Sequence, residues 1–165
     1  MPRQPHRPMF AAAAAAAAAL ALVLSANPTH AAETAAPSEP DKLTAARAQL
    51  AAKKWPAAVE ELKRVNDTGS AEWNNLMGYS LRKSETPDYV AAEKFYDTAL
   101  RIDPKHRGAL EYSGELYLIL GNLPKAETRL AALDKACRLP CEEYTDLKKS
   151  IERYKANGNK VVAKW

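Results

Sequence analysis

The sequence predicts an all-α fold in which pairs of helices stack one after another. Three observations support this prediction. Beyond residue 31 the chain has 36 alanine and leucine residues against 15 valine, isoleucine and threonine residues, a ratio that favours helix over strand. The sequence also repeats with a period of 34 to 36 residues. The prolines within residues 43–154 fall near the starts of second helices, where a missing backbone N–H does no harm, or at the ends of units.

Residues 1–31 are expected to be a cleaved export signal. They hold two arginines but no acidic residue, then an apolar run over residues 9–24, then small residues before a cleavage site after Ala31 or Ala32. An uncleaved membrane anchor is the alternative, although this alanine-rich run is short for a membrane span. No cysteine for lipid attachment lies near the cut, so the expected compartment is the periplasm of a Gram-negative bacterium.

Residues 32–40 are rich in Ala, Glu, Pro and Ser and are expected to form a disordered tether. Loss of the leader removes Arg3 and Arg7 and lowers the formal charge of the chain from +4 to +2. Such a balanced charge gives no reason to expect a nucleic acid partner, and no stable membrane insertion is expected after cleavage.

Three repeat units, each expected to form two helices joined by a tight turn, account for residues 41–140. Gly78 and Gly114 are 36 residues apart, and Ala92 and Ala126 are 34 apart, because the second unit has two extra residues in its turn. Small residues are expected where paired helices cross closely, and large apolar residues between neighbouring units. The approximate bounds of the three units are 39–70, 71–106 and 107–140.

Residues 141–165 are expected to form a capping helix and a short tail. Tyr144, Leu147, Ile151 and Tyr154 follow one another at spacings of 3, 4 and 3 residues, which places them on one stripe of a helix. Acidic residues come early in this segment and basic residues late, as the helix dipole favours. A cap is required because the last unit of a stack would otherwise expose apolar surface.

The repeats resemble tetratricopeptide repeats (TPR), and the chain is similar to small exported bacterial proteins of this family. The best copy spans 107–140 and carries the family's signature residues at Gly114, Tyr117, Gly121, Ala126 and Leu130. The second copy matches through Ala92, Tyr96 and Ala99, and the first mainly through Lys54, Trp55 and residues 57–62. The resemblance implies a right-handed superhelical stack of about three helix-turn-helix pairs plus a C-terminal capping helix.

The resemblance also implies a concave groove, lined by the first helix of each unit, that binds a peptide or a partner protein. The groove positions carry Arg47, Asn75, Tyr79, Arg82, Lys83, Glu111, Tyr112 and Glu115. Their charges predict a gradient from basic in the first two units to acidic in the third, and hence a partner of mixed charge. The family's carboxylate clamp is expected to be absent, because only Arg47 is basic among its positions. The alternative is that these side chains are simply solvated.

Catalytic chemistry is not expected. His106 is the single histidine beyond the leader, and it follows Asp103-Pro104-Lys105 as an exposed turn residue would. No motif supplies the third group that would orient it as a base. The sequence has no phosphate-binding loop, zincin helix or dinucleotide fingerprint. An enzyme, a cofactor and a bound metal are therefore not expected.

The two cysteines, Cys137 and Cys141, flank the end of the last unit. Two thiols in an oxidising compartment usually pair, and a four-residue spacing near a helix end brings the Cα atoms to about 6 Å. We expect a disulfide that fixes the angle between the last unit and the cap. A reducible switch, a copper or zinc site, and two free thiols are the alternatives.

Together these features predict a non-enzymatic protein–protein interaction or scaffold module with no chemistry of its own. The resemblance to small exported proteins of this family implies a role in envelope assembly. The alternative is a thiol redox or metal-handling protein that uses Cys137 and Cys141. A homo-oligomer is a further hypothesis, because the exposed end of a repeat stack can pack on a second copy.

Overall fold

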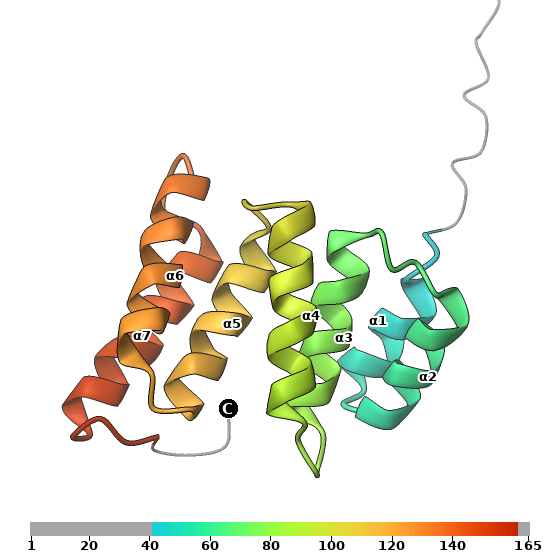
Figure 1. Ribbon diagram of the computed structural model, residues 1–165, viewed down its shortest axis with the longest axis horizontal. Coiled ribbons are helices and arrows are strands. Elements are labelled where there is room, and N and C mark those ends of the chain that lie inside the picture. The colour runs from blue at the N-terminus through green and yellow to red at the C-terminus, as the bar shows by residue number, and fades with distance from the viewer. Residues whose placement is uncertain (1–40, 162–165) are drawn as a thin grey trace, which may run out of the picture. The chain divides into compact units, whose positions relative to one another are not determined.

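The computed structural model describes residues 41–161, so the expected signal (1–31), tether (32–40) and last tail residues (162–165) lie outside the described part. Within it, every regular element is a helix (Figure 1). The seven helices are α1 (Thr44–Ala51), α2 (Trp55–Val65), α3 (Ala71–Lys83), α4 (Tyr89–Ile102), α5 (Arg107–Ile119), α6 (Leu123–Ala136) and α7 (Glu142–Ala156). The all-α prediction is confirmed.

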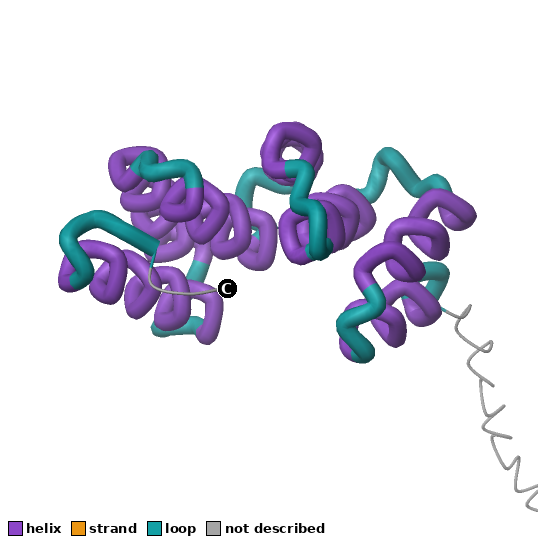
Figure 2. Tube along the Cα trace, turned by 90° about the horizontal axis from the view of Figure 1, so that it is seen from below, coloured by secondary structure: helices purple, strands orange, loops and turns teal. Residues whose placement is uncertain are grey.

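The helices pack as consecutive pairs, α1 with α2, α3 with α4 and α5 with α6. Neighbouring pairs meet through α2 with α3 and α4 with α5, and α7 covers both α5 and α6. Figure 2 shows the pairs following one another in chain order. We call the side formed by α1, α3 and α5 the first-helix face, and the side formed by α2, α4 and α6 the second-helix face.

Local sequence sets where most helices begin. Ser70, Asp88, His106 and Asn122 stand directly before α3, α4, α5 and α6, and each side chain accepts a hydrogen bond from a backbone N–H in the first turn. Such a cap contributes about 1 kcal/mol. Proline lies in the first turn of α2 and of α6, where its ring fits without loss of a hydrogen bond.

The turn after α5 depends on a glycine. Gly121 has φ +74°, and the N–H groups of Gly121 and Asn122 bond back to the carbonyls of Leu118 and Tyr117. The same turn after α1 carries Lys53 at φ 56°, a conformation that an L side chain rarely adopts. The two turns are equivalent in the repeat, so the lysine stands where glycine would be relaxed.

Buried apolar residues form three clusters along the stack. The first cluster joins α1, α2 and α3 through Leu43, Ala46, Leu62, Trp73, Leu76 and Met77. The second joins α4 to α5 through Ala92, Tyr96, Ala99, Ala109 and Leu116. The third joins α5, α6 and α7 through Leu110, Tyr117, Leu118, Ala126, Leu133, Leu147, Ile151 and Tyr154.

The two repeat glycines serve different contacts. A Cβ on Gly78 would lie 2.8 Å from Tyr96 Cε1, so this glycine permits the close crossing of α3 and α4 within one unit, as expected. A Cβ on Gly114 would lie 2.5 Å from Leu147 Cδ2, which belongs to α7. The glycine of the third unit therefore makes room for the capping helix.

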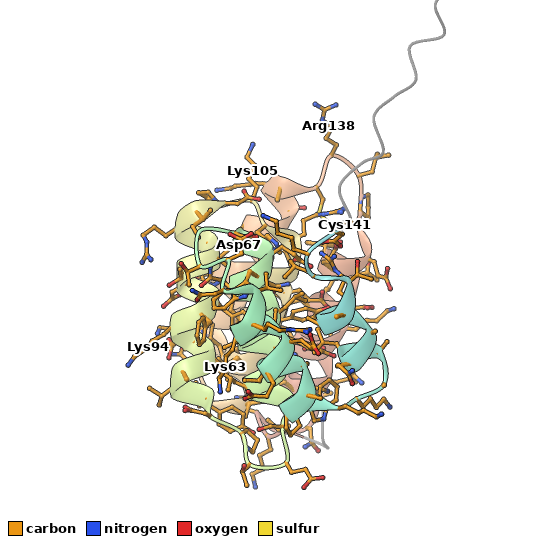
Figure 3. All side chains as sticks on the ribbon, turned by 90° about the vertical axis from the view of Figure 1, so that its right-hand side faces the viewer. Lys63, Asp67, Lys94, Lys105, Arg138 and Cys141 are labelled. Atoms are coloured by element: carbon orange, nitrogen blue, oxygen red, sulfur yellow. A yellow bond between two sulfur atoms is a disulfide. The ribbon has the colours of Figure 1, made fainter. Side chains whose placement is uncertain are left out.

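Cys137 and Cys141 form a disulfide between the end of α6 and the start of α7, with their Cα atoms 6.0 Å apart. The predicted pairing is confirmed. Figure 3 shows Cys141 at this junction and Arg138 pointing out of the loop that the disulfide closes. Among residues 41–161, no helix is long and apolar enough to cross a membrane.

Candidate functional site

The eight predicted groove residues lie on α1, α3 and α5, but they differ in exposure. Arg47 is exposed; Tyr79, Lys83, Tyr112 and Glu115 are half-buried; and Asn75, Arg82 and Glu111 are buried. The first-helix face therefore holds some of these polar side chains largely inside the protein.

A row of aromatic rings runs from α5 over α3 to the start of α2. The ring of Tyr79 on α3 lies 4.6 Å from that of Tyr112 on α5 and 5.9 Å from that of Trp55 on α2, measured between centroids. The sequence predicts groove residues only on the first helix of each unit. Trp55 begins the second helix of the first unit, so this prediction misses it. Its position directly after Lys53 and Lys54 in a turn is the signal that points to it.

Arg82 lies beneath this row and is only 4% exposed. Its Nη2 atom is 2.9 Å from Glu115 Oε2, and its Cζ atom is 5.5 Å from the ring centroid of Tyr79 and 5.6 Å from that of Tyr112. The guanidinium thus lies against both rings and links α3 to α5. The predicted charge gradient is wrong at these two positions, because Arg82 and Glu115 neutralise each other instead of forming its opposite ends.

The charge of Arg82 is maintained by its neighbours. Burial favours loss of the proton, but Tyr96 and Glu115 outweigh it and hold the pKa of Arg82 above its usual value. The Nε and Nη1 atoms of Arg82 are buried and lack a hydrogen-bond partner among the described residues. Arg82 is therefore a buried cation held between Glu115 and the tyrosine rings.

Glu111 also departs from the predicted charge gradient, because its carboxyl group is largely protonated at neutral pH. Burial raises its pKa to about 8, helped by the negative charges of Glu115, Asp146 and Glu143 and opposed by Arg82. At pH 7 this carboxyl group keeps its proton for most of the time. The acidic half of the predicted gradient is therefore weaker than the sequence indicates.

Arg47 and His106 belong to a network at the other end of α3. Arg47 Nη2 lies 3.0 Å from Glu72 Oε1, and His106 Nε2 lies 3.1 Å from Glu72 Oε2. Burial raises the pKa of Glu72, but hydrogen bonds from His106 and Arg47 more than offset this and lower it. His106 Nδ1 accepts the N–H of Ala109, so the ring caps α5. This histidine joins α3 to α5 in a structural role.

A cleft of about 770 Å³ opens where α3 and α5 end and α2 and α4 begin. Of the predicted groove residues, Tyr79, Arg82 and Lys83 line it. Lys53, Trp55 and Tyr89 are further lining residues that sequence reasoning did not select. The cleft combines cationic and aromatic side chains, which suits a ligand with an anionic group beside an apolar one.

The disulfide region offers less chemistry. Both cysteines are bonded to each other, and residues 41–161 contain no group of three His, Cys, Asp or Glu side chains placed to hold a metal ion. The thiol redox or metal-handling alternative is not favoured by this arrangement.

Comparison with known proteins agrees with the helical-repeat architecture. The chain is 30% identical over 107 residues to the BBSome complex member BBS4 of Bos taurus, a match that covers 62% of this chain and 19% of that protein. The matched part is thus about a fifth of that protein's length. No family model matches the chain. The helix pairs and this similarity are compatible with a tetratricopeptide-like fold.

Proposed function

We propose that this protein is a non-enzymatic interaction module that binds a peptide or a partner protein on its first-helix face. The observation that carries the proposal is the aromatic row of Trp55, Tyr79 and Tyr112. The buried ion pair of Arg82 and Glu115 packs beneath this row. Rigid aromatic side chains of this kind give large binding contributions at low entropic cost. The similar protein BBS4 is named as a member of a complex, which supports a protein partner here.

Affinity capture tests this function. The tagged full chain should retain a partner from its own cells, and Tyr79→Ala and Tyr112→Ala should each reduce retention at least about fivefold, because each removes a ring from the row. Lys94→Ala is the matched control, since Lys94 is exposed on α4 and points away from the helices in Figure 3. Equal retention by all three variants would contradict the proposal, provided that their helicity by circular dichroism is unchanged.

For the compartment, we propose the periplasm of a Gram-negative bacterium, with a partner in envelope assembly. The basic start and the apolar run over residues 9–24 support this. Mass spectrometry of the protein from its own cells should find a chain that begins at Ala32 or Glu33. A cytoplasmic chain that retains Met1 would contradict the proposal.

Self-association through an end of the stack is a separate proposal. Light scattering of the purified protein tests it, because a dimer doubles the mass and a monomer contradicts the idea.

A further inference from the structure

The cleft at the ends of α3 and α5 has apolar walls, and the described chain leads into one of them. The apolar and aromatic lining residues are Trp55, Tyr79, Pro87, Tyr89, Ile119 and Val161. Val161 is the last described residue and is 37% exposed. In Figure 1 the end of α7 and the end of α5 lie on the same, lower side of the stack. The chain that leaves α7 therefore reaches the cleft within a few residues.

The turn after α7 brings the chain to this cleft. Gly158 and Asn159 both have left-handed backbones, with φ 66° and 61°, so the helix cannot continue through them. The N–H of Asn159 donates to the carbonyl of Tyr154 at 3.0 Å. Asn157 Nδ2 donates to the carbonyl of Lys160 at 3.2 Å. Hydrogen bonds therefore fix the turn on both sides, directly before the chain reaches the cleft wall.

The sequence that follows Val161 matches the apolar walls. It reads Val162, Ala163, Lys164 and Trp165. Four residues extend at most about 14 Å, and the cleft has a volume of about 770 Å³. The long side chain of Lys164 leaves its ammonium group free to stay in water. A segment that is tethered at the cleft wall has an effective concentration in the millimolar range, so weak apolar contacts are enough to dock it.

We propose that residues 162–165 occupy this cleft in the unbound protein, with the indole of Trp165 packed against the rings of Trp55 and Tyr79. The apolar walls are then covered without a second molecule. This docking needs no partner, so it goes beyond the proposed function. One consequence rests on that function: a peptide that binds the aromatic row has to displace residues 162–165, because Trp55 and Tyr79 belong to both sites.

Photo-crosslinking of the purified full chain tests this placement. A photoreactive phenylalanine derivative replaces Trp165, and mass spectrometry maps the crosslinks after irradiation. The expected result is attachment within one chain to cleft residues in the turn before α2, in α3 or at the start of α4. The control is the same derivative at Leu139, which is 80% exposed on the disulfide loop and should give no crosslink to the cleft.

A mixture of isotopically heavy and light chains separates two sources of the docked segment. Crosslinks that join a heavy chain to a light one would show that the cleft holds residues 162–165 of a second copy, and would overturn docking within one chain. Crosslinks from position 165 to other parts of the stack alone, or no crosslinks, would overturn it as well. None of these results depends on a partner, so the proposed function is tested separately by Tyr112→Ala.

Uncovering of the cleft gives a second measurement. Trp165→Ser should raise the fluorescence of the apolar dye ANS at least about twofold, because the aromatic walls become accessible. Lys164→Ser is the matched control, since it leaves the indole in place and should behave like the wild type. The same dye fluorescence from both variants would contradict the docking of Trp165.

Discussion

The two faces of the stack both use an ion pair beside a tyrosine to join neighbouring units, but in different surroundings. On the first-helix face, the side chain of Arg82 is 1% exposed and that of Glu115 15%. On the second-helix face, Arg129 bonds Asp97 at 2.9 Å and Lys125 bonds Glu93 at 3.1 Å, and one partner of each pair is more than half exposed. Tyr117 lies under both of those cations.

This difference bears on the proposal that partners bind the first-helix face. Water screens the pairs of the second-helix face, so they contribute little to stability and are easily replaced. Burying an ion pair costs desolvation free energy. An apolar pair of similar size often stabilises a folded protein equally well. The protein nevertheless keeps Arg82 and Glu115 under the aromatic row, where they hold the proposed binding surface in one conformation.

The largest effect is expected from breaking the buried pair. Arg82→Met leaves Glu115 without its partner and should lower the free energy of unfolding by about 3 kcal/mol. Urea unfolding followed by circular dichroism measures this change. The double variant Arg82→Met/Glu115→Gln should recover most of the loss, because no unpaired charge remains. If Arg82→Met alone lowered the free energy of unfolding by less than about 1 kcal/mol, the buried pair would contribute no more than an exposed one, and the two faces would not differ.

A smaller, pH-dependent effect is expected at Glu111. Its pKa is raised from 4.5 to about 8 in the folded chain, so its contribution to stability is fully present below about pH 4.5 and is lost as the pH rises through 8. Glu111→Gln removes this loss and should therefore gain stability relative to the wild type as the pH rises. With allowance for screening, the relative gain from pH 5 to pH 9 should be about 1–2 kcal/mol. Equal differences at both pH values would show that Glu111 ionises normally.

On the second-helix face, Arg129→Ala should cost about 0.5–1 kcal/mol. The side chain is 22% exposed, and its Cζ atom lies 5.6 Å from the ring centroid of Tyr117, so ring packing is lost along with the bond to Asp97. Thermal unfolding measures the change. A loss as large as that of Arg82→Met would mean that the two faces are energetically alike.

The smallest effect is expected at Lys125. Its side chain is 54% exposed, so water screens its pair with Glu93, and Lys125→Ala should leave the melting temperature unchanged within error. The same result is expected at high salt. A clear drop that salt abolishes would show that the exposed pair with Glu93 contributes more than its surroundings indicate.

Much of the fold was predictable because it depends on spacing. The repeat period, the prolines in the first turns and the cysteine pair act locally, and the structure bears out the helices and the disulfide that they predict. The close crossing of α3 and α4 at Gly78 was likewise predictable. The role of Gly114 was not, because its neighbour Leu147 belongs to a helix outside the repeat.

The candidate site was less predictable because it depends on side-chain direction and burial. Arg82 and Glu115 stand at groove positions in the repeat, but periodicity does not show that one side chain folds inward to meet the other. Trp55 was missed because it begins a second helix and reaches across to Tyr79. Lys53 becomes informative only when its φ is compared with that of Gly121.

The central claim is that partners bind the first-helix face, and site-specific photo-crosslinking tests it most directly. A photoreactive phenylalanine derivative is placed at Tyr79 in the full chain, or at Lys94 as the control on α4, and the cells are irradiated. The account predicts a discrete crosslinked partner from position 79 and none from position 94. Adducts from position 94 alone, or the same adducts from both positions, would contradict it.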